Sequence, residues 1–466
     1  MRQDILKEVR GAWGIVLNTL RGGDDSDSTP RVIVTDELTP MFASMIERGA
    51  VAAVLAASGG RYSHGAILAR SFGVPAIVGV RDLLRRVTEG TILAVNGDDG
   101  SVLVNPTPEE TQQSRGAPKG AGRAPARAAG RGAPAGIHEG RRARRGDGEC
   151  RHAARSRGNR PPHDRWDWPL PHRVPFPRQQ RIPSEDEQYH QYRRAIEKIG
   201  RRPVVFRTLD SGGDKPLPYF QTPKEANPAM GWRGLRISLE VPDLFIPQSR
   251  AILRAGAHGD ARLLVPMVTS AEEMVRVREI LASILADLKA TGVPHRADMP
   301  LGAMIEVPAA ALTMDAIAEV SDFVSIGTND LVQYLLGVDR DNTRVGGLYD
   351  PFHPGVLRTI AEVVSKARTS NRDVSLCGEL AGDPQTTALL AGLGLRCLSM
   401  APVAVPQVKA AVRSFSMSEA GELATSALAS RSATEVREKV RALEDRRSHS
   451  GGTHQAGGSQ PTGRSQ

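Results

Sequence analysis

The chain has little of what marks a secreted or a membrane-spanning protein. It contains three cysteines in 466 residues, Cys150, Cys377 and Cys397, which are too few for a disulfide framework. No apolar run approaches the roughly 20 residues that a membrane-spanning helix needs. The start, MRQDILKEVR, is charged and lacks the apolar stretch of a signal peptide. We therefore expect a reducing, cytoplasmic location and no insertion into a membrane.

Aromatic residues are also scarce, at 4%, but the hydrophobic share of 40% and the length suffice for several folded domains. The net charge of +9 is unevenly distributed. Residues 111–182 hold 16 Arg and one Lys against five acidic residues, a net charge of +12, which leaves −3 for the rest of the chain. Gly, Ala and Pro dominate this segment and it has no apolar periodicity, which is typical of a disordered basic stretch.

A folded region precedes the basic segment. Residues 4–20 have apolar side chains at helical spacing and end at a Gly-Gly pair, which predicts a helix. Short β-rich runs separated by helical or turn-like stretches follow, which predicts a small α/β domain over residues 24–110. Its expected strands are Arg31–Thr35, Val51–Ala56, Ala76–Val78 and Thr91–Val95.

A second folded region is expected over residues 183–440. Its strand-then-helix units predict parallel strands with right-handed crossovers. The expected strands are Val204–Arg207, Leu263–Met267, Gly302–Val307, Phe323–Ile326, Val374–Cys377 and Leu398–Met400. A closed TIM-type (β/α)8 barrel needs eight strands, so the predicted barrel is incomplete by two. Residues 441–466 are rich in Gly, Ser, Gln and His and are expected to be a disordered tail.

Polar side chains stand at or after the ends of these strands, where a parallel barrel places its functional groups. They are Arg207, Glu306, Asn329, Asp330, Arg340 and Cys377. Glu306 and Asp330 are hard oxygen ligands of the kind that hold Mg²⁺. Arg207 and Arg340, with Arg233, offer planar forks for phosphate or carboxylate oxygens. The set predicts a site for a small phosphorylated anion.

Two residues have the chemistry of a proton donor or a nucleophile. Cys377 is either a buried small apolar residue or, between a strand end and Gly378-Glu379, a proton donor. His64, in GGRYSHGAILAR, follows a Gly-rich turn and precedes an apolar helix start, so its imidazole is expected where backbone N–H groups hold an anion. Imidazole can take a phosphoryl group, although a solvated turn histidine fits the same spacing.

Six motifs, in order, resemble a known family. GGRYSHGAILARSFGVPAIVGV, RPVVFRTLDSGGDKPLPY, GWRGLR, MIEVPAAAL, SIGTNDLVQYLLGVDR and SLCGELAGDP are similar to enzyme I of the bacterial sugar phosphotransferase system, the phosphoenolpyruvate-protein phosphotransferases. The resemblance covers about residues 1–110 and 183–440. It implies a remnant of a helical carrier-binding subdomain over 1–23, a small swivelling phosphohistidine domain, and a TIM-type barrel that binds phosphoenolpyruvate.

The resemblance also implies roles for single residues. His64 would take the phosphoryl group of phosphoenolpyruvate, and Cys377 would protonate the enolate of the departing pyruvate. Arg207, Arg233, Asn329 and Arg340 would bind phosphoenolpyruvate, and Glu306 and Asp330 would ligate Mg²⁺. A histidine phosphocarrier protein would receive the phosphoryl group, and the barrels would pair as homodimers. The motifs are compatible with a sugar-uptake branch and with a nitrogen-linked regulatory branch.

Three features depart from the family pattern. The region ahead of the phosphohistidine domain is short, which places carrier docking in question. The family usually has Thr where this chain has Tyr62, directly before the Ser-His pair. Residues 112–182 match nothing in the family, although the first two barrel strands and a phosphoenolpyruvate-binding arginine belong there.

We hypothesise that a reading-frame error explains the third departure. Read from the second base of each codon, Trp166–Pro175 permits Gly-Ile-Gly-Leu-Phe-Arg-Thr-Glu-Phe, which resembles the second barrel strand of the family. The same offset over Asp147–Ala154 permits Met-Ala-Asn-Val-Gly-Thr-Pro, which resembles the first. We therefore expect the chain as printed to form an incomplete barrel with little or no activity.

Other functions stay compatible with the sequence. Pyruvate phosphate dikinase and phosphoenolpyruvate synthase share this barrel and a swivelling histidine domain, but they carry an ATP-binding domain ahead of the histidine, and none is visible here. An inactive remnant and a basic interaction protein are further alternatives. The basic segment lacks aromatic residues interleaved for base stacking, so we expect no nucleic-acid partner.

Overall fold

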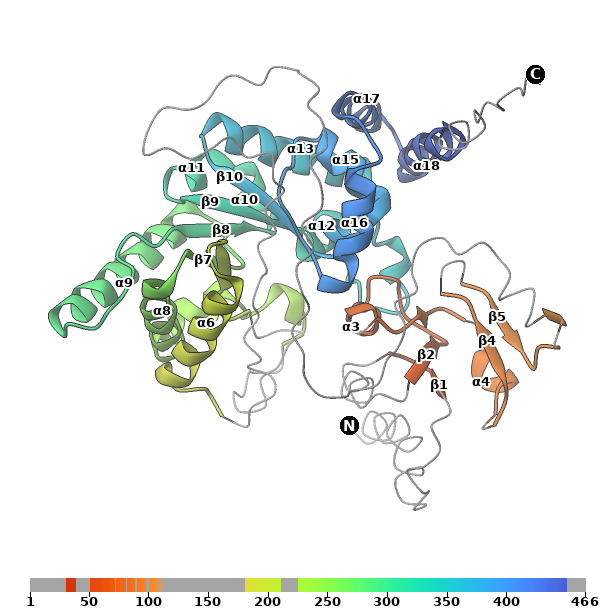
Figure 1. Cartoon of the computed structure of the whole chain (residues 1–466), viewed down its shortest axis with the longest axis horizontal. Helices are drawn as coiled ribbons and strands as arrows, with labels where there is room; N and C mark the ends of the chain where they lie inside the picture. Colours follow the sequence, from red (N-terminus) through yellow and green to blue (C-terminus); the bar gives the residue numbers. More distant parts are fainter. Residues whose placement is uncertain are drawn as a thin grey trace, which may run out of the picture.

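The computed structural model describes residues 31–38, 51–71, 73–80, 82–88, 90–97, 100–107, 109–110, 181–210 and 225–450. They form a small α/β part and a larger one, coloured orange and yellow to blue (Figure 1). The helix expected over residues 4–20 and nearly all of the basic segment lie outside the described residues. No helix in the described ranges is long and apolar enough to cross a membrane.

The small part is built on a parallel sheet of three strands, β1 (Arg31–Thr35), β2 (Val51–Ala56) and β3 (Ala76–Ile77), in that order. Helix α3 (His64–Ser71) connects β2 to β3 and buries Ala69 against Val54 and Ala56. The remaining elements are α4 (Leu83–Arg86) and an antiparallel pair, β4 (Leu93–Val95) and β5 (Val102–Val104). Strand β5 was not expected from the sequence.

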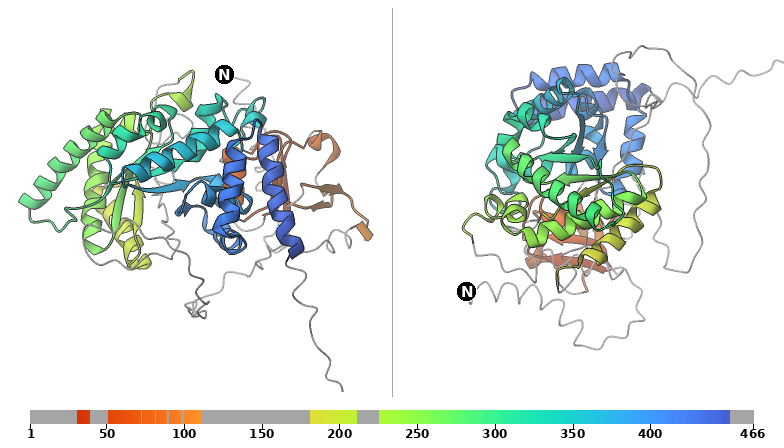
Figure 2. Two further views of the ribbon diagram at one scale, coloured as in Figure 1. Left: turned by 90° about the horizontal axis from the view of Figure 1, so that it is seen from above. Right: turned by 90° about the vertical axis from the view of Figure 1, so that its left-hand side faces the viewer.

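The larger part contains one parallel sheet of six strands. The strands are β6 (Val204–Arg207), β7 (Ala261–Val265), β8 (Leu301–Ile305), β9 (Phe323–Gly327), β10 (Asp373–Cys377) and β11 (Leu398–Ser399). They neighbour one another in chain order, and helices join them, as in a (β/α) barrel. The sheet is curled, with helices on its outer side (Figures 1 and 2). All six expected strands are present, each within two residues of its expected start.

Thirteen helices of the larger part are described. They are α6 (Glu185–Ile199), α7 (Leu235–Glu240), α8 (Pro242–Ala255), α9 (Ala271–Ala290), α10 (Pro308–Leu312), α11 (Met314–Glu319), α12 (Thr328–Leu336), α13 (Pro354–Thr369), α14 (Glu379–Gly382), α15 (Thr387–Gly392), α16 (Val405–Val412), α17 (Met417–Leu428) and α18 (Ala433–Ser450). Three of them begin with a capping box, in which a serine and the glutamate three residues later satisfy each other's backbone N–H groups; the serines are Ser184, Ser270 and Ser416. Helix α18 continues to Ser450, ten residues into the segment expected to be disordered.

The two faces of the six-stranded sheet bury different layers. Phe206, with alternate residues of the other strands, packs outward against the helices in the main core. The inward-facing Val205, Leu264, Met304 and Phe323 form a separate small layer, against which Cys377 packs. This period of two is what parallel strands covered on both faces require. Within the described residues, β6 and β11 each have a neighbour on one side only, so the barrel is not closed there.

Candidate active site

The carboxyl ends of the parallel strands lie at one edge of the sheet, which we call the carboxyl edge. Arg207 ends β6, Glu306 directly follows β8, and Cys377 ends β10. Asn329 and Asp330 lie in the first turn of α12, which starts where β9 stops. Parallel pairing from β6 to β10 therefore brings residues from distant parts of the sequence to the same edge.

Arg233 is the largest fully buried side chain of the described residues, with 1% of its surface exposed. Its Nη2 lies 3.1 Å from Oδ1 of Asp210 and 3.3 Å from Oδ2 of Asp330. Its Nη1 donates to the hydroxyl of Tyr334 at 3.4 Å. One guanidinium therefore bridges two buried carboxylates, and in this arrangement it orients Asp330.

Glu306 accepts a hydrogen bond from the backbone and lies among other buried charged groups. Its Oε1 accepts the N–H of Met267 at 2.7 Å, and Met267 has the left-handed φ of 58° that aims this N–H inward. A Cβ on Gly327 would lie 2.6 Å from Glu306 Oε2, so only glycine leaves room for the carboxylate. Burial, and then repulsion by Asp330 and Asp210, raises the pKa of Glu306 to about 8.

Arg207 lies in the same acidic surroundings. Its Nη2 is 3.3 Å from Oδ2 of Asp210, and its Nη1 is 3.8 Å from the sulfur of Met304 on β8. Burial alone would lower its pKa, but Asp210 and Glu306 raise the pKa of Arg207 above the ordinary value. Arg207 therefore stays protonated, and an anion bound at the carboxyl edge would lie beside its positive charge.

A second set of hydrogen bonds ties α12 to the end of β10. The hydroxyl of Thr328 donates to the carbonyl of Cys377 at 2.8 Å, and the N–H of Glu379 donates to Oδ1 of Asn329 at 3.1 Å. Between them Gly378 has φ of 119°, and a Cβ there would lie 2.4 Å from Thr328 Oγ1. These bonds fix the amide of Asn329 and the backbone of Cys377.

Arg340 lies on the loop after α12 and is 4% exposed. Oε1 of Gln333 accepts its backbone N–H at 3.1 Å, and the carbonyl of Arg340 closely faces Gly346. Tyr349, which follows this loop, is buried, and its hydroxyl donates to the carbonyl of Asn329 at 3.2 Å. The loop therefore belongs to the carboxyl edge.

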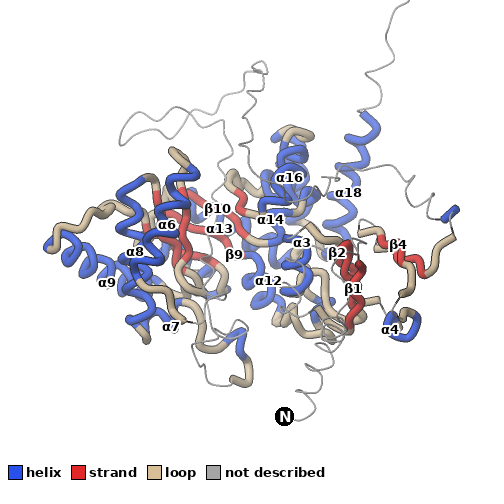
Figure 3. Tube along the Cα trace, turned by 60° about the horizontal axis from the view of Figure 1, so that its bottom comes forward, coloured by secondary structure: helices blue, strands red, loops and turns tan. Residues whose placement is uncertain are grey.

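His64 is the first residue of α3, at the helix N-terminus where the sequence analysis expected it. Helix α3 lies against the carboxyl edge of the larger part, close to α12 and α14 (Figure 3). An ion pair between Arg70 of α3 and Glu379 of α14 joins the two. The structure therefore brings helix α3 to the edge that holds the expected residues of the larger part.

Asp210, Tyr334 and Tyr349 were not expected from the sequence as site residues. Asp210 stands three residues after Arg207 in the motif FRTLD, and its carboxylate could have been noticed as a partner for arginines. Nothing in the local pattern marks Tyr334 or Tyr349, because both owe their place to contacts with distant residues.

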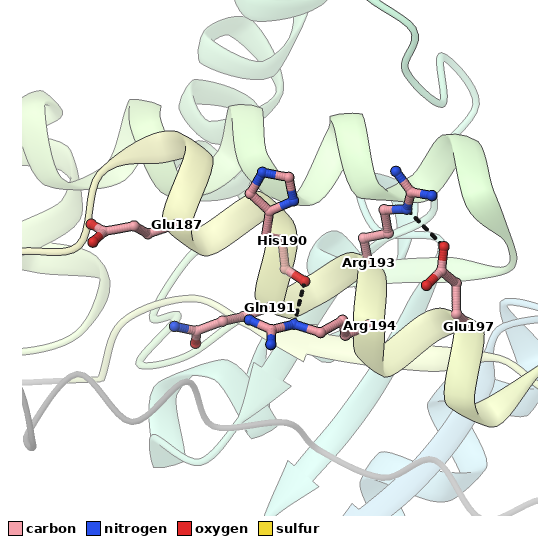
Figure 4. A pocket seen from close by; sticks show the side chains of 6 residues that line it. All are labelled: Glu187, His190, Gln191, Arg193, Arg194 and Glu197. Atoms are coloured by element: carbon pink, nitrogen blue, oxygen red, sulfur yellow. Dashed lines mark hydrogen bonds and ion pairs between the residues drawn. The ribbon is translucent and has the colours of Figure 1, made fainter.

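One hollow in the described surface lies elsewhere. It is formed on α6 (Figure 4) by Glu187, His190, Gln191, Arg193, Arg194 and Glu197. Its charged groups already have partners, since Arg193 Nε lies 2.7 Å from Glu197 Oε1 and Arg194 Nε donates to the carbonyl of His190 at 3.2 Å. It is not part of the candidate site.

Comparison with known proteins decides the family. The family model described as "PEP-utilising enzyme, PEP-binding domain" matches residues 173–417, and "PEP-utilising enzyme, mobile domain" matches residues 28–100. Over 412 residues the chain is 37% identical to a phosphoenolpyruvate-protein phosphotransferase of Geobacillus stearothermophilus, covering 87% of this chain and 70% of that protein. The chain belongs to the phosphoenolpyruvate-protein phosphotransferase family.

Two further relatives agree with this assignment. A phosphoenolpyruvate-protein phosphotransferase of Haloferax volcanii is 40% identical over 454 residues, which is 94% of this chain and 76% of that protein. An Escherichia coli protein named for the phosphoenolpyruvate-dependent phosphotransferase system is 36% identical over 454 residues, 92% of this chain and 58% of that protein. The chain is thus an enzyme of the type that transfers the phosphoryl group of phosphoenolpyruvate.

The residues at the carboxyl edge fit the Mg²⁺ that such an enzyme implies. In the described ranges, no three His, Cys, Asp or Glu side chains gather as a metal site. Mg²⁺ needs fewer, because it keeps waters and binds one or two carboxylates together with substrate oxygens. Burial, followed by repulsion from Asp330 and Asp210, raises the pKa of Glu306, and a divalent cation would relieve that repulsion.

The pKa of Glu306 predicts how stability depends on pH. Between its ordinary pKa of 4.5 and about 8, the folded protein keeps a proton that the unfolded chain releases. The free energy of unfolding should therefore fall as the pH rises through this window, by up to about 1.4 kcal/mol per pH unit. Urea unfolding of the magnesium-free protein between pH 5 and 8 measures this slope.

The matched control for this prediction is Glu306→Gln, which cannot titrate. Its stability should vary less with pH over the same window, and added Mg²⁺ should raise the stability of the wild type but not that of the variant. An equal slope in both proteins would contradict the assignment of the titration to Glu306.

Proposed function

We propose that the chain transfers the phosphoryl group of phosphoenolpyruvate to His64 and from there to a histidine phosphocarrier protein, with release of pyruvate. One observation carries the proposal: Arg207, Glu306, Asp330 and Cys377 gather at the edge of the sheet against which α3, the helix that His64 opens, is docked. Phosphoryl transfer requires the protein to position the reacting groups and to stabilise the charge of the transition state, and the residues at this edge would do both.

Arginines and an amide would hold the substrate. Arg207, with 11% of its side chain exposed, and the buried Arg340 are cations at the carboxyl edge and would bind the phosphate and carboxylate oxygens of phosphoenolpyruvate. Asn329 would donate from its amide nitrogen, since its Oδ1 is taken by the N–H of Glu379. Arg233 would act chiefly by orienting Asp330. Glu306 and Asp330 would hold Mg²⁺, which would neutralise charge on the phosphate.

Cys377 would complete the reaction. When the phosphoryl group leaves phosphoenolpyruvate, the enolate of pyruvate remains, and its methylene carbon must gain a proton. Cys377 ends β10 and packs against the inward-facing layer of the sheet, so its thiol would face a substrate bound there. It would donate the proton to carbon and recover one from water, so that pyruvate is released.

The test is labelling with phosphoenolpyruvate that carries ³²P. We expect slow, Mg²⁺-dependent, acid-labile label on the chain, slow because the barrel lacks two strands within the described residues, and its loss in His64→Gln, because a phosphohistidine is the product. The matched control is His190→Gln, an exposed histidine on α6 that should leave the label unchanged. Label that survives in His64→Gln, or that comes from ATP and not from phosphoenolpyruvate, would contradict the proposal; the second result would favour a dikinase-like enzyme.

Two partners complete the proposal. Transfer of the label from the chain to a histidine phosphocarrier protein tests the acceptor. Homodimerisation through the barrel follows from the family resemblance and is checked by sedimentation velocity.

A further inference from the structure

The loop before α3 and α3 itself touch the carboxyl edge at three places, which we call the docking contact. The ring centroids of Tyr62 and Tyr349 are 5.0 Å apart, with planes inclined by 43°. Arg61 Nη2 lies 3.7 Å from Oδ2 of Asp383. Arg70 pairs with Glu379, and the carbonyl of Arg61 accepts from Nη2 of Arg70 at 3.1 Å. Two cations and a ring of the small part thus face two carboxylates and a ring.

Tyr62 contributes its buried surface to the larger part. The core of the small part consists of Leu38, Val54, Ala56 and Ala69, and Tyr62 is not among the residues packed against it. The half-buried Tyr62 packs instead against the core of the larger part. Its burial, more than any nearby charge, raises the pKa of its phenol. The ring therefore stabilises the contact between the parts and not the fold of the small part.

The partner ring is firmly held. The hydroxyl of Tyr349 donates to the carbonyl of Asn329, whose Oδ1 in turn accepts from the N–H of Glu379. The next residue, Asp350, is bound by both terminal nitrogens of Arg437 on α18, each at 2.7 Å. Tyr62 contacts Tyr349 and Arg70 contacts Glu379, and both partners are hydrogen-bonded to Asn329, a proposed substrate-binding residue.

We propose that Tyr62, assisted by Arg70, anchors the small part on the barrel while the phosphoryl group is transferred to His64. Tyr62 is a positioning residue: it acts by setting how often α3 lies at the carboxyl edge. This inference rests on the proposed function for its consequence, but the anchoring can be measured without any reaction. It also accounts for a tyrosine at a position where the family usually has threonine.

Hydrogen exchange of the full chain tests the anchoring directly. In Tyr62→Ala, peptides that cover residues 58–63 and 345–350 should exchange about tenfold faster, because an aromatic pair contributes roughly that factor to an equilibrium. Tyr62→Phe keeps the ring and should exchange like the wild type. Peptides from the core of the small part, such as 51–56, should not change. Equal exchange in wild type and Tyr62→Ala would overturn the inference.

Charge reversal gives a second, independent test. Arg70→Glu places two carboxylates together and should speed exchange of the same peptides, and Arg70→Glu combined with Glu379→Arg should restore the protection. The control Arg85→Glu makes the same charge change on the small part at a side chain that is 86% exposed and outside the docking contact. Lack of rescue in the double variant, with normal stability, would contradict a direct role of this pair.

Kinetics separates this inference from the proposed function. At saturating phosphoenolpyruvate, Tyr62→Ala should label His64 about tenfold more slowly, with the half-saturating concentration of phosphoenolpyruvate unchanged, because anchoring acts after substrate binding. Unchanged labelling together with unchanged exchange would overturn the anchoring and leave the function intact. Absence of label in every protein, with the exchange difference still present, would overturn the proposed function and leave the anchoring intact.

Discussion

Replacing Arg233 with methionine is expected to lower the free energy of unfolding by about 3–5 kcal/mol, since the loss of one partner leaves buried charge uncompensated. Arg233 bridges Asp210 and Asp330, which are 2% and 6% exposed. Without Arg233, these two carboxylates and Glu306 would be buried close together with less compensating positive charge. Urea unfolding near pH 7 measures the loss, which should shrink at low pH, where the acids are protonated.

Two variants sharpen this experiment. Arg233→Lys keeps the charge but cannot bridge two carboxylates with a planar fork, so its stability should fall between wild type and Arg233→Met. Arg344→Met removes an exposed arginine near the same edge and should change stability by less than about 0.5 kcal/mol. If Arg233→Met is as stable as Arg344→Met, the bridge between the two carboxylates is not what holds this site together.

Restoring the reading frame across residues 111–182 is expected to raise the rate of phosphoenolpyruvate-dependent labelling by about 10²–10³-fold, the usual cost of one missing electrostatic contact to a transition state. The second-frame reading supplies two strands and an arginine. In an eight-stranded barrel these strands would pair with β6 and β11, which have one neighbour each within the described residues. Stability should also rise, because open strand edges and the inner layer would be covered.

The encoding DNA is the first check on this prediction. If the second frame across this stretch does not spell the two strands, the hypothesis fails. If it does, a chain with the frame restored is compared with one in which residues 112–182 are replaced by a neutral linker of equal length. Only the restored chain should gain labelling; an equal gain in both would mean that the basic segment merely obstructs the site.

Much of the fold could be predicted because its signals are local. Strand β6 was expected over Val204–Arg207 and is observed there, since a β-rich run between helical stretches specifies a buried strand. Strand β5 was missed, because Val102–Val104 is short and partly exposed and gains its structure from pairing with β4. Residues 441–450 were predicted to be disordered but continue α18, because the polar end of this helix has no apolar periodicity and its docking is decided by contacts such as Arg437 with Asp350.

The candidate site likewise has features that could be predicted from the sequence and features that could not. That Arg207, Glu306 and Cys377 share one edge follows from parallel strands, a rule that needs no coordinates. That Arg233 binds Asp210 and Asp330 does not, because side-chain direction and burial depend on how separate units pack.

The amino-acid sequence by itself determined the family, the order of the strands and the residue types at their carboxyl ends, because motifs and periodicity are properties of neighbouring residues. Only the tertiary structure decided that Tyr62 packs on Tyr349 and that α3 meets α14, because contacts between residues far apart in the chain depend on shape and charge that form when the parts come together.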